Sequence, residues 1–243
     1  LPFSLVNKLD GLSKKMIPID ADRVMKMAER TTGLSDWGGG GFEQRLKETV
    51  DGVNAANLNT TGLFGARYAF NWHLGNKLRI VDFAKRHPEL DEGDIERPIV
   101  ITGFFRTGTT FLQNVLPADP NNRVAKAWEL SYPLGRLGDP LGDVAWRRAQ
   151  AKFTFGFNQV AIPDQSVAHN VTADSYEECF FLLENEMAVL TFWVGFCAYD
   201  YANAMLGWDM TEPYEAHKLQ LKMLNAQRSA ERWVLKCPWH IWN

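Results

Sequence analysis

The chain has 243 residues, of which 46% are hydrophobic and 23% are charged, and this composition excludes a disordered protein. Its 26 basic and 29 acidic residues give a net charge of -3. Wholesale nucleic-acid binding is therefore excluded, and any anion site must be local. Three cysteines without C-x-x-C spacing argue against a disulfide framework and against a zinc site, and they favour a reducing, cytoplasmic location.

Residues 1 to 95 are expected to form a helical N-terminal region. The segment DADRVMKMAERTTGL has helical apolar spacing and ends at Gly33, a suitable C-cap residue. FEQRLKETVDGV repeats the pattern, and ARYAFNWHLGNKLRIVDFAKRHPEL predicts a longer helix that Pro88 ends. His73 and His87 have no second histidine three or four positions away, so we expect packing or surface residues and not metal ligands.

Four consecutive glycines occupy positions 38 to 41 of this region. They predict a flexible turn. A second phosphate loop is the alternative, but no strand precedes the glycines and no basic residue lies among them.

The pattern changes at Pro98. PIVITGF is a short β-branched run typical of a strand buried on both faces of a parallel sheet. A glycine-containing turn follows, and residues 109 to 116 are expected to form a helix. In this strand, loop and helix order, the loop N–H groups and the positive end of the helix dipole converge above the end of the strand. An anion is expected there.

The loop itself differs from a nucleoside-triphosphate loop. Gly103 and Gly108 have the spacing of G-x-x-x-x-G-K-[S/T], but Thr109 occupies the lysine position and Arg106 lies inside the loop. Without that lysine, triphosphate chemistry lacks its principal cation. Backbone donors, threonine hydroxyls and one arginine suit a single tetrahedral anion, or a phosphate joined to one other such group.

Two later segments complete the expected core, an α/β region over residues 96 to 243. In SYEECFFLLENEM, Ser175 and Glu178 have capping-box spacing and predict a helix that runs into the apolar stretch of residues 187 to 199. That stretch is shorter than the roughly 20 residues that cross a bilayer, so a buried helix is expected and no transmembrane segment. RWVLKCP predicts a second buried strand, residues 233 to 236, and the chain ends soon after it. We therefore expect a C-terminally truncated domain.

Four stretches in this order resemble the sulfotransferase family, in its bacterial branch with an R-T-G-T-T loop. They are PIVITGFFRTGTTFLQNVLPADP, WELSYP, SYEEC and RWVLKCPWH. The resemblance runs from about Gly33 to the end. It implies a P-loop-like parallel sheet flanked by helices, and transfer of a sulfuryl group from 3′-phosphoadenosine 5′-phosphosulfate (PAPS) without magnesium. The acceptor would be a hydroxyl or amine of a small or lipid-like molecule.

The resemblance also assigns site residues. Arg106 would stabilise charge on the bridging oxygen, and Lys236 would lean toward the transferring group. The residues that would hold the 5′-phosphate follow Arg106: Thr107, Gly108, Thr109 and Thr110. Phe105 stands where the family usually has proline, and Pro117 interrupts a place where it tends to continue its helix. The Arg-Asp-Pro stretch and later serine that grip the 3′-phosphate would lie beyond Asn243.

Transfer to a hydroxyl requires a general base. The candidates are His169, Glu177, Glu178 and His240, with His240 favoured and Glu178 second. His240 qualifies only if the turn after Pro238 brings it back. Two alternatives to a sulfotransferase stay open: a P-loop nucleotide kinase or NTPase, and a catalytically incomplete nucleotide-binding module.

Overall fold

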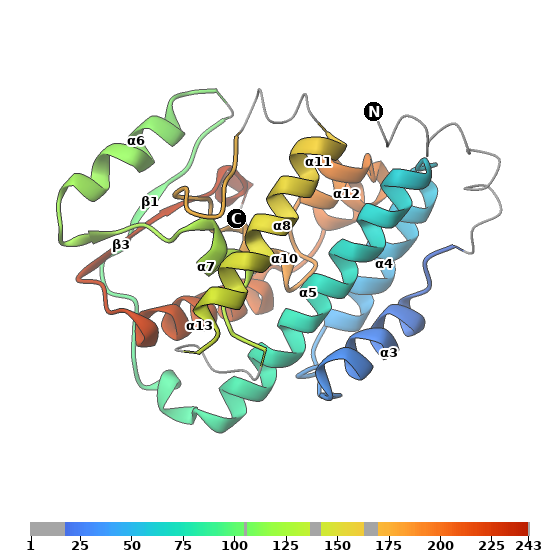
Figure 1. Ribbon diagram of the computed structural model, residues 1–243, viewed down its shortest axis with the longest axis horizontal. Helices are drawn as coiled ribbons and strands as arrows, with labels where there is room; N and C mark the ends of the chain where they lie inside the picture. Colours follow the sequence, from blue (N-terminus) through green and yellow to red (C-terminus); the bar gives the residue numbers. More distant parts are fainter. Residues whose placement is uncertain (1–17, 105, 137–141, 163–169, 243) are drawn as a thin grey trace. The chain divides into compact units, whose positions relative to one another are not determined.

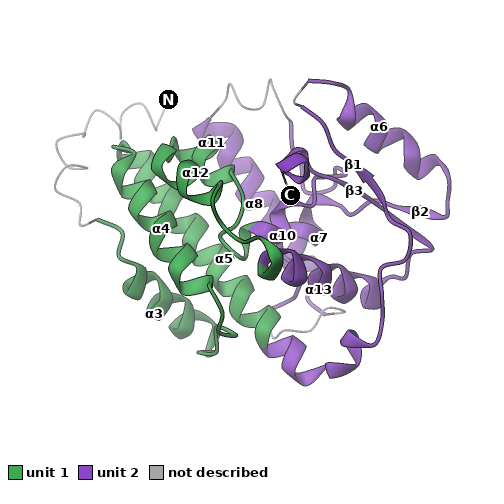
Figure 2. Cartoon of the chain, turned by 180° about the vertical axis from the view of Figure 1, so that it is seen from behind, with its two compact units in different colours: residues 1–81, 184–212 green, residues 82–183, 213–243 purple. Residues whose placement is uncertain are grey.

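The chain forms two compact units that alternate along the sequence (Figures 1 and 2). The computed structural model describes residues 18–104, 106–136, 142–162 and 170–242. Unit 1 comprises Leu1–Val81 and Glu184–Glu212, and unit 2 comprises Asp82–Leu183 and Pro213–Asn243. The division into a helical region and an α/β core at residue 95 stays a prediction. No helix among the described residues is long and apolar enough to span a membrane.

Unit 1 is helical over its described residues. Its helices are α3 (Ala21–Thr32), α4 (Phe42–Ala55), most of α5 (Thr60–Arg86), α11 (Thr191–Phe196) and α12 (Tyr199–Met205). Helix α3 begins where the Asp20 carboxylate accepts the Arg23 N–H at 2.9 Å, and it ends at Gly33 with a left-handed φ of 73°. The predicted C-cap is therefore confirmed, and α5 ends two residues before Pro88 as expected.

The core of unit 1 depends on close contact between α4 and α12. Phe42, Leu46 and Val53 of α4 are buried together with Phe70 of α5. Gly52 permits the approach of α12, since a Cβ atom there would lie 2.6 Å from the Tyr201 Cβ.

The prediction of one buried helix over residues 187 to 199 is wrong. The chain instead turns at Met187, forms α11 and turns again at Cys197 before α12. Both turning residues have positive φ, 55° and 54°. The Tyr201 hydroxyl holds the first turn by donating to the Met187 carbonyl at 2.7 Å and accepting the Val189 N–H at 3.1 Å.

Unit 2 contains a three-stranded parallel sheet in the order β1-β3-β2. Its strands are β1 (Ile99–Ile101), β2 (Asn122–Arg123) and β3 (Arg232–Lys236). The helices associated with it are η1 (Pro88–Asp91), α6 (Thr109–Val115), η2 (Leu116–Ala118), α7 (Ala127–Ser131), α8 (Val144–Ala161), α10 (Phe180–Glu184), α13 (Thr211–Gln227) and η3 (Pro238–Trp242). The α/β fold, its parallel sheet and its two main strands confirm the sequence-based prediction.

Burial in the sheet is uneven. Ile101, Val124 and Val234 form a small buried core with Ile99 and Leu116 packed against it. Val100 is 49% exposed, so the expectation that β1 is buried on both faces is wrong. Among the described residues β1 is an edge strand, and one face of it is not covered.

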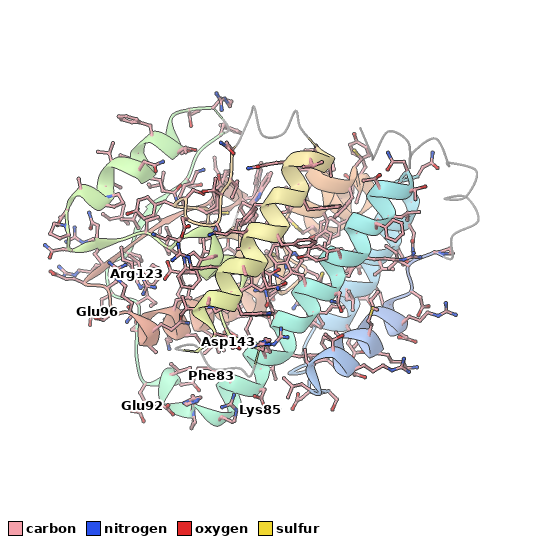
Figure 3. All side chains as sticks on the ribbon, viewed as in Figure 1. Phe83, Lys85, Glu92, Glu96, Arg123 and Asp143 are labelled. Carbon is pink, nitrogen blue, oxygen red and sulfur yellow. The ribbon has the colours of Figure 1, made fainter. Side chains whose placement is uncertain are left out.

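Arg123 connects the elements around β2 (Figure 3). Its guanidinium donates to Glu129 of α7 at 2.9 Å and to the Leu224 carbonyl of α13 at 2.9 Å, and it lies over the Trp233 ring of β3 at 4.2 Å. A buried arginine is tolerated because it has both a charge partner and hydrogen-bond acceptors. This connection fixes β2 and α7 next to the strand that ends in Lys236.

Candidate functional site

The loop between β1 and α6 takes the backbone conformation that an anion site requires. Arg106 and Gly108 have left-handed φ values of 66° and 88°, and Thr107 between them has a negative φ. Such alternation turns successive N–H groups toward one point. The Thr107 hydroxyl closes the turn by donating to the Phe104 carbonyl at 2.7 Å. Helix α6 starts with the Leu112 N–H on the Gly108 carbonyl, so the N–H groups before it have no partner within the helix.

Lys236 reaches this loop from the neighbouring strand. Parallel pairing aligns it with Ile101, so both residues stand at the same end of the sheet. Its ammonium donates to the Thr110 hydroxyl at 3.2 Å and also to the Glu178 carboxylate. The residue is only 3% exposed. The structure therefore brings together three of the residues that the sequence singled out: Thr110, Glu178 and Lys236.

Glu178 does not serve as a capping-box residue, and that prediction is wrong. Helix α10 begins two residues later, at Phe180, and the Ser175 hydroxyl donates to the Thr172 carbonyl. The Glu178 carboxylate instead contacts Lys236. Burial raises the pKa of Glu178 above its usual range, although the Lys236 ammonium acts in the opposite direction. A carboxylate with a raised pKa is a better general base near neutral pH.

Backbone and amide hydrogen bonds hold the Glu178 segment in place. The Cys179 N–H donates to the Lys236 carbonyl at 2.9 Å, and the Glu177 N–H donates to the Ala125 carbonyl at 3.1 Å. The buried Gln113 amide of α6 donates to the Glu177 carbonyl at 2.7 Å. Sequence reasoning missed Gln113, because a single glutamine in a short amphipathic helix gives no signal of a distant partner.

The side chains of Glu177 and His240, the other described candidates for the general base, have partners of their own. Both ring nitrogens of His240 are engaged: Nδ1 with the Tyr214 hydroxyl at 2.6 Å and Nε2 with the Cys179 Sγ at 3.2 Å. The Glu177 carboxylate accepts the N–H of Glu178 at 3.0 Å. His169 lies outside the described residues. Of the candidates whose contacts the structure describes, Glu178 is the one that contacts both the strand lysine and, through it, the loop.

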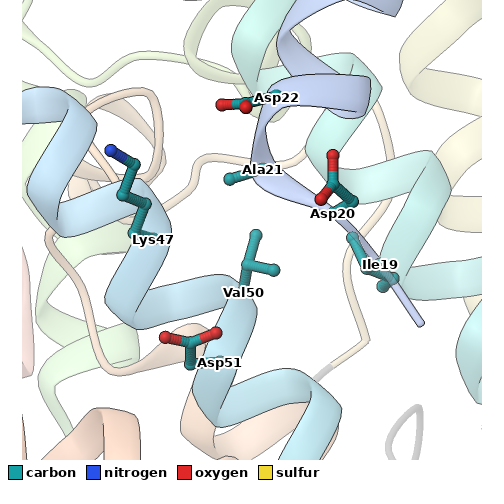
Figure 4. A pocket seen from close by; sticks show the side chains of 7 residues that line it. All are labelled: Ile19, Asp20, Ala21, Asp22, Lys47, Val50 and Asp51. Atoms are coloured by element: carbon teal, nitrogen blue, oxygen red, sulfur yellow. The ribbon is translucent and has the colours of Figure 1, made fainter.

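Two other places could have been mistaken for anion sites. At the glycine run, the Gly41 N–H donates to the Glu212 carboxylate at 2.8 Å, so a negative group already occupies that turn. A pocket in unit 1 carries three carboxylates and one ammonium (Figure 4). It is lined by Ile19, Asp20, Ala21, Asp22, Lys47, Val50 and Asp51. Its negative charge makes it unsuitable for a phosphate or sulfate.

The arrangement at the sheet end combines an anion-holding loop with a buried cation and a carboxylate. Fixed donors and cations of this kind stabilise negative charge that develops on a reacting oxygen. The exposed loop residues Arg106, Thr107 and Gly108 can be reached by a ligand. The chemistry of these groups suits a tetrahedral anion and a proton transfer next to it.

Comparison with known proteins identifies the fold and the family of the chain. The fold resembles that of sulfotransferase STF1 of Mycobacterium tuberculosis H37Rv, with a TM-score of 0.74, 24% identity and 93% of this chain covered. It also resembles sulfotransferase STF9 of Mycobacterium avium, with a TM-score of 0.74, 27% identity and 92% covered. The chain spans 62% and 58% of the lengths of those proteins. No curated protein matches it. The model of the sulfotransferase family matches residues 98–243, and the chain therefore belongs to the sulfotransferase family.

Proposed function

We propose that the chain transfers a sulfuryl group from PAPS to a hydroxyl or amine acceptor. The observation that carries this proposal is the hydrogen-bonded series of Thr110, Lys236 and Glu178 at the end of the parallel sheet. It joins the anion loop to a buried cation and to a carboxylate that can act as a base. The family of the chain supports the same reaction.

The loop would hold the 5′-phosphosulfate end of the donor. Left-handed backbone at Arg106 and Gly108 supports a ring of N–H donors, and the start of α6 adds further donors. Thr107, Thr109 and Thr110 would add hydroxyls. With Thr109 in the position of the triphosphate lysine, this donor set suits a phosphosulfate better than a nucleoside triphosphate with magnesium.

In the transfer step, the acceptor oxygen attacks the sulfur in line with the bond to the bridging oxygen. The new S–O bond forms as the old one breaks, and the electron pair of the broken bond stays on the 5′-phosphate. Adenosine 3′,5′-bisphosphate is the leaving group. Arg106 and Lys236 would stabilise the charge on its bridging oxygen.

We assign the proton of the acceptor to Glu178. Its carboxylate contacts Lys236, whereas both ring nitrogens of His240 are engaged by Tyr214 and Cys179. Protonation neutralises the Glu178 carboxylate. The Lys236 ammonium can then donate a hydrogen bond to the leaving oxygen, on which the negative charge develops. An ammonium has three N–H donors. Among the described residues Thr110 and Glu178 accept two of them, which leaves the third for the donor substrate.

The experiment that tests this function is a sulfuryl-transfer assay with PAPS and a panel of alcohols, phenols and amines. Arg106→Ala should lower the transfer rate by roughly 100-fold or more, because it removes a cation aimed at the transition-state charge. Arg136→Ala is the matched control, since Arg136 is an exposed arginine paired with Asp143 and such surface pairs contribute little. Near-normal transfer by Arg106→Ala would contradict the proposal.

A further inference from the structure

A cluster of nitrogen and sulfur ligands lies in unit 2 beside the candidate site. Cys179 precedes α10, His217 lies on α13 and His240 lies on η3. One ligand atom from each of these residues lies within 4.8 Å of the others. The Cys179 Sγ and His240 Nε2 atoms lie 3.2 Å apart. Three elements that are distant in the sequence therefore present metal-binding atoms to one point.

The ring of His217 has only part of its hydrogen bonding satisfied by the described residues. The residue is 5% exposed, and its ring hydrogen bonds to the backbone of Cys179. Its Nε2 has no hydrogen-bond partner among the described residues. A buried polar atom without a partner costs free energy and calls for an explanation. A metal ion bound to Nε2 would supply the missing partner.

We propose that Cys179, His217 and His240 bind a Zn²⁺ ion. Zinc–nitrogen bonds of about 2.0 Å and zinc–sulfur bonds of about 2.3 Å place tetrahedral ligand atoms roughly 3.3 to 3.8 Å apart. The three ligand atoms lie within 4.8 Å of one another, so side-chain shifts of roughly 1 Å would bring them to that spacing. Thiolate and imidazole are also the ligand types that zinc prefers over magnesium or calcium.

Neighbouring side chains complete the site. The Cys237 thiol interacts with Cys179 and His240 but lies outside the group of three ligand atoms, so it would have to move toward the ion to supply the fourth ligand. The Tyr214 hydroxyl contacts His240 Nδ1 at 2.6 Å and can accept its N–H, which directs the lone pair of Nε2 to the ion. A closed set of two thiolates and two imidazoles is typical of structural zinc. On binding, the two thiols release their protons to solvent and the imidazoles bind neutral.

The ion would stabilise the proposed transfer site. Cys179 directly follows Glu178, and Cys237 directly follows Lys236. A bound Zn²⁺ would therefore fix the backbone at both members of the Glu178–Lys236 pair. The spacing of the cysteines in the sequence argued against a zinc site. It could not reveal this one, because the proposed ligands come from separate segments that only the fold brings together.

The test is metal binding by the full chain, treated with a chelator and kept reduced with a phosphine. Titration with Co²⁺ should give one equivalent of bound ion with a thiolate-to-cobalt charge-transfer band, and Zn²⁺ should displace it. Zn²⁺ should also raise the melting temperature. Cys179→Ala and His217→Gln should each weaken binding at least about tenfold. Cys197→Ala is the matched control, because Cys197 is exposed and outside the cluster, and it should bind as the wild type does.

Circular dichroism of the metal-free proteins would show whether Cys179→Ala or His217→Gln unfolds the chain. In that case Tyr214→Phe, which removes only a hydroxyl, still tests the proposal. Loss of one hydroxyl that orients a ligand should weaken binding about 10- to 100-fold. The proposal is overturned if the wild type shows no thiolate band. It is also overturned if folded Cys179→Ala, His217→Gln and Tyr214→Phe all bind as tightly as Cys197→Ala.

Discussion

Glu178 and Lys236 form a buried charged pair beside the loop between β1 and α6. The two residues are 58 positions apart in sequence and contact each other in a buried environment, with side-chain exposures of 11% and 3%. Two buried charges are tolerated when each compensates the other, and removal of one partner is costly. The pair therefore keeps a carboxylate and an ammonium adjacent to each other next to the loop.

Glu178→Gln tests the assignment of the base. Glutamine keeps a hydrogen-bond acceptor for Lys236 but cannot take a proton, so transfer should fall roughly 10²- to 10⁴-fold while nucleotide binding changes little. Because burial raises the pKa of Glu178, the wild-type kcat should fall as pH is lowered, beginning above the range of an ordinary glutamate. Steady-state kinetics across pH would measure both effects.

Glu177→Gln is the control for that experiment, because Glu177 is buried beside Glu178 and has no assigned role in the transfer. It should keep near-normal transfer at neutral pH, and because the Glu177 charge also raises the pKa of Glu178, its acid limb should move slightly toward lower pH. A Glu178→Gln enzyme with normal kcat would contradict the assignment of the base to Glu178.

Local residue patterns predicted single elements of this fold well. Gly33 ends α3, Pro88 follows α5, and β1, the loop and α6 occur in the expected order, because caps and strand patterns depend on neighbouring residues. The predicted capping box at Ser175 is not formed, since the Glu178 carboxylate pairs with Lys236 of β3. The long apolar helix failed because Met187 and Cys197 take positive φ, which neither residue type signals.

The contact between α4 and α12 gives a prediction at the scale of elements. Gly52→Ala would place a Cβ atom 2.6 Å from the Tyr201 Cβ and 3.0 Å from its backbone nitrogen. Because backbone cannot move aside cheaply, we expect a loss of about 1–3 kcal/mol in the free energy of unfolding. Urea denaturation would measure it.

Gly156→Ala is the matched helical control. Nothing lies within 4 Å of a Cβ added at Gly156 in α8, so the higher helix propensity of alanine should stabilise the chain by about 0.5–1 kcal/mol. Equal effects of the two substitutions would mean that α12 does not approach α4 as closely as described.

At the scale of the whole molecule, buried ionisable groups couple stability to pH. In unit 1, Glu186 lies between Arg45 and Lys77 at 3.2 and 2.7 Å. Glu184 and His73 are 3.6 Å apart, but both are neutral near pH 7. Burial raises the pKa of Glu184 to about 8 and lowers that of His73 to about 4. Their contact is therefore not an ion pair.

The shifted pKa values of Glu184 and His73 each make the free energy of unfolding depend on pH. Glu184 has a pKa of 4.5 when unfolded and about 8 when folded, so its contribution is lost as pH rises from 4.5 to 8. His73 has values of 6.5 and about 4, so its contribution is lost as pH falls from 6.5 to 4. Between pH 4.5 and 6.5 these two contributions cancel each other, and the lowered pKa of His217, about 3, makes the chain less stable as pH falls through the same range. From pH 6.5 to 8, the contribution of Glu184 should lower the unfolding free energy by up to about 2 kcal/mol, and comparison with a variant that lacks this carboxyl isolates it from the other shifted groups.

Urea denaturation of the wild type and Glu184→Gln at pH 5, 6.5 and 8 would test this dependence. Glutamine has no proton to lose, so the variant should lack the decrease between pH 6.5 and 8. Parallel curves for the two proteins would show that Glu184 is already ionised in the folded chain.

The sequence predicted the anion loop and the family, but it did not predict the complete site. Arg106 to Thr110 are contiguous, so one motif identifies them. The partners Glu178, Gln113 and Lys236 come from three separate segments, and only parallel pairing of β1 with β3 brings Lys236 to Thr110. His217 and Cys179 likewise come from separate segments, and the position of α13 in unit 2 brings them together. Long-range contacts of this kind leave no local pattern.

The most direct test of the account is a calorimetric titration of the chain with adenosine 3′,5′-bisphosphate, compared with ATP and magnesium. We predict selective binding of the bisphosphate, unchanged in Arg136→Ala and weakened at least about tenfold in Arg106→Ala and Lys236→Ala, because each removes a charged hydrogen-bond donor. Tighter binding of ATP with magnesium, or bisphosphate binding that neither Arg106→Ala nor Lys236→Ala weakens, would contradict the proposed donor site.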